Sequence, residues 1–297
     1  MLIAVTGTTG LVGGALCPFL ASQSYKIRKL VRKSTGASDE KVWDPYAEKL
    51  DAAVLEGADA VVHLAGENIA GRWSKKKKAA IRESRVKSAC LLAETMAKMS
   101  TPPRTFVCAS AIGFYGERGE QMVNEESTVG SGFLPELCKA WEDACKPASI
   151  AGIRVVNLRI GVIMSSKGGA LAKMLTPFKL CLGGVVGSGK QYWSWIALDD
   201  ILGAIQHVLA TPALKGPVNL VSPNACDNRS FTKTLGKVLH RPTIFPLPAF
   251  VAKLVLGEMA EGLLLMSTRV EPRRLLESGY PFRHAELESA LKSTLGK

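Results

Sequence analysis

Residues 1–15 read MLIAVTGTTGLVGGA, and this stretch decides the fold of the chain. The apolar run from Leu2 to Val5 has the length of a buried strand, and it breaks at Gly7. From Leu11 onward the apolar residues recur at helical spacing. The sequence therefore predicts a strand, a glycine turn and a helix in direct succession.

The glycines of this turn have the spacing Gly-x-x-Gly-x-x-Gly. In a dinucleotide fingerprint the first glycine allows the tight turn, the second lets backbone amides approach a pyrophosphate, and the third lets the helix pack against the strand. The helix N-terminus then points its partial positive charge at the phosphates. A chance glycine turn is the alternative, but the strand before it and the helix after it favour the fingerprint. The expected pyrophosphate contacts are Gly7, Thr8, Thr9, Gly10, Leu11, Val12 and Gly13.

A second strand is predicted over residues 26–31, and the residues at its end indicate which dinucleotide binds. In an NAD site an acidic side chain about twenty positions past the glycines accepts hydrogen bonds from the ribose 2′-hydroxyl. Here Val31 is followed by Arg32 and Lys33, and no acid occurs until Asp39. A guanidinium pairs well with a 2′-phosphate, which a carboxylate would repel. The sequence favours NADP, with Val31 and Arg32 at the adenosine end; the alternative is that Arg32 is a solvent-facing strand end.

Residues 57–66 form an apolar strand that ends in a turn of small residues. At the carboxyl end of a parallel strand, such a turn lets the backbone pass under the cofactor ribose. His63 lies inside this strand, where we expect a packed, hydrogen-bonded histidine. A long helix is predicted from about 75 to 99, and Arg85 either reaches the cofactor from it or lies on a basic surface. The cofactor contacts expected from these segments are Leu64, Ala65, Gly66 and Arg85.

The strand predicted over residues 105–110 ends in a serine, and a tyrosine follows five residues later. A serine at the end of a strand, with aromatic residues in the next loop, is placed to hydrogen-bond a substrate oxygen. We therefore expect Ser110 to orient the substrate, and Tyr115 lies close to it in the sequence. A later aromatic cluster at residues 192–195 is either a pocket wall or a hydrophobic plug. Asp199, which follows it, is expected to cap the next helix.

The alternation of strands and helices predicts an α/β fold: a Rossmann doubly wound parallel sheet with a small, mainly helical C-terminal lobe. We predict an NADP-binding domain over residues 1–164 and a substrate lobe over 165–297. A strand at about 217–221 is expected to return to the sheet. A separate module is expected at about 246–295, where prolines punctuate helical segments.

Composition restricts the class of protein further. The 297 residues are 47% apolar, which is enough for a full core, yet no apolar run is long enough to span a membrane. Seven scattered cysteines without a Cys-x-x-Cys pair, and no signal peptide, favour a reducing cytoplasmic setting without metal. The net charge of +12 is densest at residues 75–78, but no aromatic residues interleave to stack bases. We expect a small-molecule substrate, no membrane partner and no nucleic acid; an oligomer is possible.

Taken together, these motifs resemble the extended short-chain dehydrogenase/reductase superfamily, in its NAD-dependent epimerase/dehydratase group. Within that group the chain resembles, along its whole length, the "epimerase family protein" subgroup once described as cell-division inhibitors. The resemblance implies an NADP-bound Rossmann domain whose nicotinamide end is covered by a small C-terminal lobe. It also adds Arg159 and Ile163 to the expected cofactor contacts. The matching segments are residues 6–13, 63–68, 83–85, 110–116, 141–142, 159–163, 182–184, 187–189, 246–250, 257–258 and 263–265.

The chain departs from this family at the proton-transfer pair. Family enzymes that move hydride use Tyr-x-x-x-Lys, in which the tyrosine exchanges a proton and the lysine holds the ribose. If Glu142 follows the motif as in the family, Leu134 occupies the tyrosine position and Cys138 the lysine position. Tyr115 is the substitute acid that the sequence offers, or it packs on the cofactor.

Two hypotheses therefore remain. In the first, the protein is an NADP(H)-dependent oxidoreductase or epimerase of a small carbonyl or sugar-like substrate, with Ser110 orienting the oxygen and Tyr115 or water supplying the proton. In the second, it is a catalytically weak or inactive NADP-binding regulatory protein. The intact fingerprint favours the first, and the missing pair favours the second.

Overall fold

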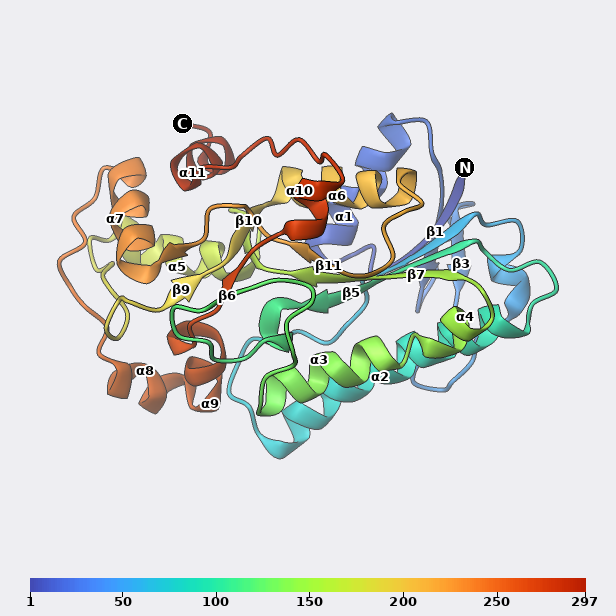
Figure 1. The fold of residues 1–297 in the computed structure, drawn as a ribbon, viewed down its shortest axis with the longest axis horizontal. Helices are drawn as coiled ribbons and strands as arrows, with labels where there is room; N and C mark the ends of the chain where they lie inside the picture. The colour runs from blue at the N-terminus through green and yellow to red at the C-terminus, as the bar shows by residue number, and fades with distance from the viewer.

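The computed structural model describes all residues from 1 to 297. The centre of its fold is a sheet of seven parallel strands (Figure 1). The strand order is β11-β7-β5-β4-β1-β2-β3, so the chain reverses its direction of winding between β1 and β4. In open α/β sheets, such a reversal opens a crevice for a ligand at the carboxyl ends of the strands. The strands are β1 (Leu2–Thr6), β2 (Lys26–Val31), β3 (Glu40–Val42), β4 (Ala60–His63), β5 (Thr105–Ala111), β7 (Arg154–Ile160) and β11 (Gly216–Leu220).

Helices cover both faces of this sheet. α1 and α6 pack together over one face, where apolar side chains such as Leu16 and Ile205 join the strand residues in one core cluster. α2, α3 and α4 cover the other face, with Leu92 and Trp141 in a second cluster. The predicted Rossmann fold is confirmed, because both faces are buried as a parallel sheet requires. These helices are α1 (Leu11–Ser22), α2 (Lys75–Lys98), α3 (Phe133–Asp143), α4 (Lys146–Ile150) and α6 (Leu198–Ala210).

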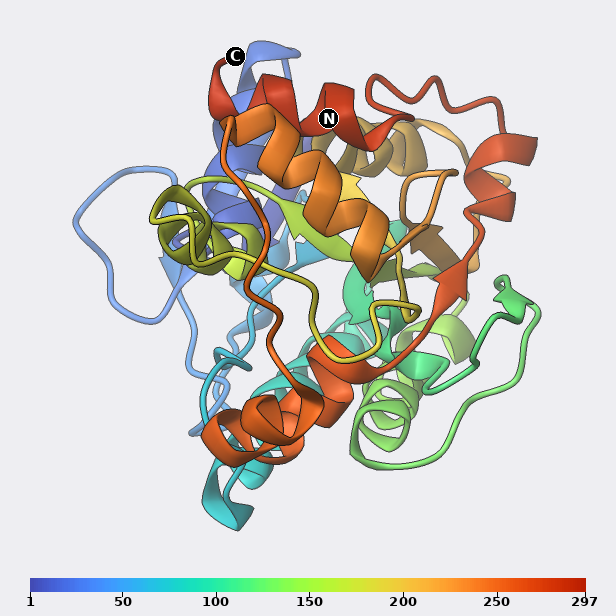
Figure 2. The ribbon, with the colours of Figure 1, turned by 90° about the vertical axis from the view of Figure 1, so that its left-hand side faces the viewer.

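Most of the remaining elements gather beyond the carboxyl ends of the strands, on the side that faces the viewer in Figure 2. Three short two-stranded pairings hold them together: β8 with β10, β9 with β12, and β6 with β13. Their strands are β6 (Met122–Val123), β8 (Val162–Met164), β9 (Tyr192–Trp193), β10 (Trp195–Ala197), β12 (Cys226–Asp227) and β13 (Arg269–Val270). Their helices are α5 (Gly169–Lys179), α7 (Asn228–Leu239), α8 (Ala249–Leu256), α9 (Glu258–Ala260) and α11 (Leu287–Leu295), with a π-turn at Glu261–Leu265 and a 3₁₀ turn η2 (Ile112–Phe114). Two short elements lie elsewhere: α10 (Arg273–Glu277) packs against β11, and the 3₁₀ turn η1 (Ala52–Leu55) packs against α2.

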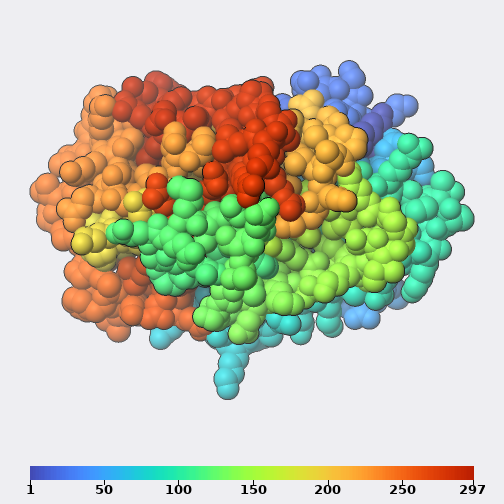
Figure 3. Space-filling view, in the orientation of Figure 1, coloured from blue at the N-terminus to red at the C-terminus, as the bar shows by residue number.

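The C-terminal segment returns to the body of the protein after this excursion. Figure 3 shows it packed beside the segment that contains residues 115–130. Ser267 links the two by donating its hydroxyl proton to the carbonyl of Gly119, while its own backbone amide donates to Glu117. No helix combines the length and the apolar composition that a crossing of a lipid bilayer requires.

The aromatic cluster that follows α5 is a plug. Trp193 and Trp195 are buried in the core of the second lobe, against Phe231 of α7.

The prediction that Asp199 caps α6 is wrong: Ala197 occupies the cap position, and it has no side chain that could accept a hydrogen bond. Asp200 is buried instead, and it accepts hydrogen bonds from the backbone amides of Arg283 and His284. A single carboxylate thus ties the C-terminal segment to α6.

We predict that Asp200→Ala lowers the free energy of unfolding by about 3 kcal/mol, because the part-buried amides of Arg283 and His284 lose a charged acceptor. Chemical denaturation measures this change. Asp199→Ala is the matched control: it removes the neighbouring exposed carboxylate of the same helical turn, and the expected change is about 0.5 kcal/mol, a helix-dipole effect. Equal losses in the two variants would contradict this role of Asp200.

Candidate cofactor and substrate site

The glycine turn between β1 and α1 is packed backbone against backbone. Gly7 has a φ of +70°, and a Cβ there would lie 2.6 Å from the carbonyl carbon of Leu64, at the end of β4. A Cβ at Gly13 would lie 2.3 Å from the carbonyl oxygen of Gly7. Neither position can accept a side chain without moving backbone. The two glycines therefore bring the start of α1 directly over the edge where β1 and β4 end.

The N-terminus of α1 is left open by this arrangement. Gly10 is the cap residue and offers no side chain to the free amides of the first turn. Thr9 and Gly10 are exposed, and Leu11 and Val12 are partly exposed. Unsatisfied amides and the helix dipole make such an end a binding site for phosphate groups. Leu11 also contacts the start of α5: a Cβ at Gly168 would lie 3.5 Å from its side chain, and the carbonyl of Ile163 lies close to Gly169.

Arg32 stands at the end of β2, directly after Val31. Its side chain is exposed and forms no ion pair; the only aromatic ring beneath its guanidinium is that of Tyr46, 5.9 Å away. β2 pairs with β1, so this unpaired guanidinium lies at the same edge of the sheet as the glycine turn, and its charge suits a phosphorylated ligand.

The end of β4 is held in place by a buried chain of hydrogen bonds. The hydroxyl of Thr6 accepts from the amides of Leu64 and Ala65, and it lies 2.7 Å from Nδ1 of His63. Nε2 of His63 lies 2.9 Å from the hydroxyl of Ser88 on α2. Burial, and secondarily the charge of Arg85, lowers the pKa of His63 to about 3, so the ring is neutral. As expected, His63 is a packed histidine; here it positions the turn at residues 64–66.

Arg85 crosses from α2 to this turn. Its guanidinium donates to the carbonyls of Glu67 and Ile81, and a Cβ at Gly66 would lie 3.2 Å from its central carbon. It lies 5.1 Å from the ring centre of Trp141 on α3. No carboxylate pairs with it, although it is half-buried, and burial lowers the pKa of Arg85 from its ordinary value. An unpaired, half-buried cation is costly unless a ligand supplies electron-rich oxygens.

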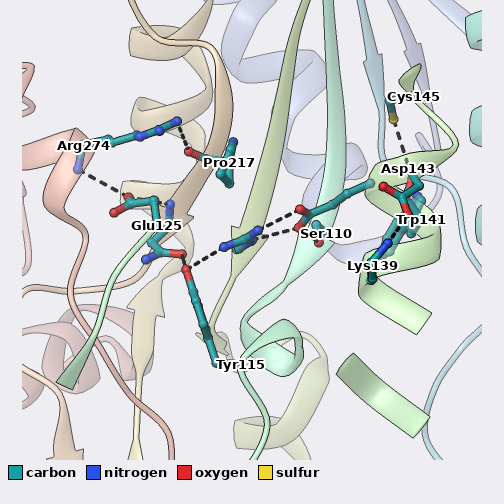
Figure 4. Close-up of polar contacts among 12 residues, drawn as sticks. Ser110, Tyr115, Glu125, Lys139, Trp141, Asp143, Cys145, Pro217 and Arg274 are labelled. Atoms are coloured by element: carbon teal, nitrogen blue, oxygen red, sulfur yellow. Dashed lines mark hydrogen bonds and ion pairs between the residues drawn. The ribbon is translucent and has the colours of Figure 1, made fainter. Parts of the chain in front are cut away.

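A second arginine, Arg159 at the end of β7, is fully paired (Figure 4). Its Nε and Nη2 donate to the two carboxylate oxygens of Glu142, both at 2.8 Å, and its Nη1 donates to the hydroxyl of Tyr115 at 3.0 Å. The hydroxyl of Ser110 donates to the same carboxylate at 2.7 Å. The bidentate pair is almost entirely buried. Such geometry is that of a structural ion pair whose desolvation is offset by good hydrogen bonds.

This network changes the roles expected for Ser110 and Tyr115. The Tyr115 side chain is fully buried, and its hydroxyl donates to Asn219 while it accepts from Arg159. Burial raises the pKa of Tyr115 to about 12. A hydroxyl that is enclosed and occupied on both sides is poorly placed to give a proton to a ligand. Ser110 is 3% exposed and turned toward Glu142, which places it in the wall of the site.

The structure does not bring Arg159 to the cofactor edge as an open side chain, because its guanidinium is used by Glu142 and Tyr115. Sequence reasoning missed this pairing. Glu142 lies 17 residues before Arg159, and only the packing of α3 against the sheet brings the two together. The one available signal was that both residues belong to segments matching the family.

Leu134 and Cys138, the positions expected for the tyrosine and lysine if Glu142 follows the motif as in the family, lie side by side on α3 and face η2. A Cβ at Gly113 would lie 3.3 Å from Leu134 and 3.7 Å from the sulfur of Cys138. Burial raises the pKa of Cys138 to about 12, so its thiol carries no charge. Leu134 is covered by Trp73 and by Met259 of the C-terminal module. These two side chains therefore form an apolar, uncharged contact with η2.

Comparison with known proteins agrees with this architecture. A family model described as the NAD dependent epimerase/dehydratase family matches residues 3–221, and one described as a domain of unknown function matches residues 247–294. An epimerase family protein of Mycobacterium tuberculosis is 38% identical over 291 residues, which span 98% of this chain and 96% of its own. The human epimerase family protein SDR39U1 is 34% identical over 296 residues, 98% of this chain and 99% of its own.

Solved structures give the same result. A crystal structure of human epimerase family protein SDR39U1 (isoform 2) with NADPH superposes with a TM-score of 0.92 at 33% identity, over the whole of both chains. A nucleoside-diphosphate sugar epimerase from Corynebacterium glutamicum gives a TM-score of 0.84 at 37% identity, covering all of this chain and 58% of that one. The family resemblance inferred from the sequence motifs is confirmed.

We predict that Glu142→Gln lowers the free energy of unfolding by about 3–5 kcal/mol, because it leaves the Arg159 charge buried without its partner. Thermal and chemical denaturation measure the change. Glu136→Gln, on the exposed face of the same helix, is the control and should have almost no effect. An unchanged stability of the Glu142 variant would show that the pair is not structural.

Proposed function

Because the chain belongs to the NAD-dependent epimerase/dehydratase family, we propose that it binds NADPH and reduces the carbonyl group of a small substrate. The observation that carries the proposal is the open N-terminus of α1, held over the β1–β4 edge by glycines that tolerate no side chain. Uncapped amides at the topological switch point of a parallel sheet are suited to a pyrophosphate. The NADPH in the human relative's crystal structure supports the same ligand.

Different residues at the carboxyl edge of the sheet would hold the pyrophosphate, the adenosine end and the ribose of the cofactor. Thr8 to Val12 would offer backbone amides to the pyrophosphate, and Arg32 would grip the 2′-phosphate at the adenosine end. Leu64 to Gly66 would pass under the ribose, since the Thr6 hydroxyl already fixes their amides. Ile163 of β8 would lie on the opposite side, beside the contact between Leu11 and α5.

The chemistry would take place where Arg85 meets the end of β4. NADPH, when bound, supplies a hydride. Arg85 is an unpaired cation next to Gly66 and near Cys138, the position expected for the family's lysine. It would hydrogen-bond the nicotinamide ribose and polarise the substrate oxygen. Because the buried hydroxyl of Tyr115 is hydrogen-bonded to both Asn219 and Arg159, the proton of the product alcohol would come from water. Ser110 would act through the Glu142–Arg159 pair as a positioning residue.

A second function is favoured by one specific observation. Leu134 and Cys138 replace both groups of the proton-transfer pair, and Trp73 and Met259 close over Leu134. This arrangement suits a protein in which NADPH orders a surface for a partner and is not turned over. A screen of carbonyl substrates followed by NADPH absorbance distinguishes the two functions: turnover supports the reductase. Tight NADPH binding without turnover across a broad panel would favour the regulatory protein.

We expect Arg32→Glu to weaken NADPH binding by one to two orders of magnitude, about 1.4–2.7 kcal/mol, because repulsion replaces attraction at the 2′-phosphate. NADH binding should change far less, and fluorescence titration with both nucleotides measures the difference. Arg82→Glu on the exposed side of α2 controls for the change in net charge. An NADPH affinity equal to that of the wild type would remove Arg32 from the site.

For Arg85→Gln we expect kcat/KM with any substrate found by the screen to fall by about 10²–10³, the effect of removing one preorganised donor (~2.7–4 kcal/mol). Arg82→Gln, three positions earlier on the same helix and exposed, should leave kcat/KM unchanged. Steady-state kinetics at saturating NADPH provide the measurement. If the two variants are equally active, Arg85 has no part in the reaction.

A further inference from the structure

The large exposed apolar side chains of this protein are concentrated in one region. Of the fourteen that the structure exposes, eight lie in residues 180–182 and 244–263. Several protrude far into solvent: Phe250 is 72% exposed, Leu254 76% and Ile244 70%. A folded domain rarely keeps so many large apolar groups together on its surface unless something covers them. We call this set the apolar patch: Leu180, Leu182, Ile244, Phe245, Phe250, Leu254, Val255 and Leu263.

The two segments of the apolar patch lie side by side. The amide of Gly187 donates to the carbonyl of Leu247, and the amide of Leu247 donates to the carbonyl of Val185. Gly184 is pressed so closely against the backbone of Phe245 that a Cβ at Gly184 could not be accommodated. α8 follows at once and carries Phe250 and Leu254. In Figure 2 these segments lie on the face turned toward the viewer.

The charges around the apolar patch are mostly positive. No aspartate or glutamate occurs in residues 144–198 or 228–257, and the two acids in the last part of the patch segment, Glu258 and Glu261, form ion pairs with Lys78 and Lys253. Exposed cations are held at its border: Arg241 donates to the carbonyl of Lys179, and Arg229 donates to that of Ser188. The ion pairs formed nearby use other cations, Lys237 with Glu288 and Lys253 with Glu261. Lys179, Arg229 and Arg241 form no ion pair, so they carry unneutralised positive charge at the border of the apolar patch.

We propose that this face docks on an anionic phospholipid surface, with the apolar patch entering the headgroup region and the cations meeting the lipid phosphates. An apolar helix face bordered by Lys and Arg is the pattern of proteins that lie on a membrane without crossing it. A second copy of the chain fits less well, because a symmetric contact would bring this positively charged face against itself. The proposal changes the sequence-based expectation of no membrane partner, and it is independent of the proposed reduction.

Vesicle co-sedimentation of the full chain tests the proposal. Wild-type protein should pellet with vesicles of mixed phosphatidylglycerol and phosphatidylcholine, and at least tenfold less with phosphatidylcholine alone. Raising the salt concentration should weaken the binding, because surface charges are screened. The double variant Phe250→Ser/Leu254→Ser should lose at least tenfold of the bound fraction. A charge variant, Lys179→Glu/Arg241→Glu, should do the same on anionic vesicles.

Met122→Ser/Leu276→Ser is the matched control, because it removes two exposed apolar side chains outside the apolar patch. It should bind vesicles as the wild type does. NADPH affinity and melting temperature of every variant check that the fold is kept. Failure of the wild type to bind anionic vesicles would overturn the proposal, and so would equal loss in the control and patch variants. Self-association that the patch variants abolish, without vesicle binding, would assign the face to a second copy and also overturn it.

Discussion

The close backbone contact between Gly7 and Gly13 is the constraint on which the rest of the site depends. It presses α1 onto the edge where β1 and β4 end, and it leaves the first turn of α1 without a capping side chain. The same contact sets Gly7 against Leu64, so the cofactor turn after β4 takes its place from the glycine turn after β1. A ligand in the crevice therefore meets peptide groups that folding has already ordered, which lowers the entropic cost of binding.

Two arginines near this crevice differ in how their charges are satisfied. Arg159 is matched by Glu142 inside the protein, and this pair holds Ser110 and Tyr115 in fixed orientations. Arg85 has carbonyl partners but no carboxylate, beside the turn that follows β4. Because a carboxylate neutralises the first and nothing neutralises the second, only Arg85 keeps its charge available to a ligand. The site is thus built from a closed structural pair and an open cation.

The parts that could be predicted from the sequence are those that local pattern determines. The strand, glycine turn and helix at residues 1–20, and the cation after the second strand, follow from spacing within a few positions. The enclosure of Tyr115 could not be predicted, because it depends on Asn219, 104 residues further along the chain. The burial of Asp200 rather than Asp199 likewise depends on where residues 283–284 pack. Hydroxyl groups near a strand end identify a site, but only tertiary packing decides which of them faces a ligand.

The central claim is that the edge formed by β1, β4 and α1 takes a dinucleotide whose extra phosphate meets Arg32. A crystal structure of this chain grown with NADPH tests it most directly. We predict density for the pyrophosphate at the amides of Gly10 to Val12 and for the 2′-phosphate within hydrogen-bonding distance of the Arg32 guanidinium. An adenosine end bound far from residue 32, or no nucleotide at the N-terminus of α1, would contradict the account.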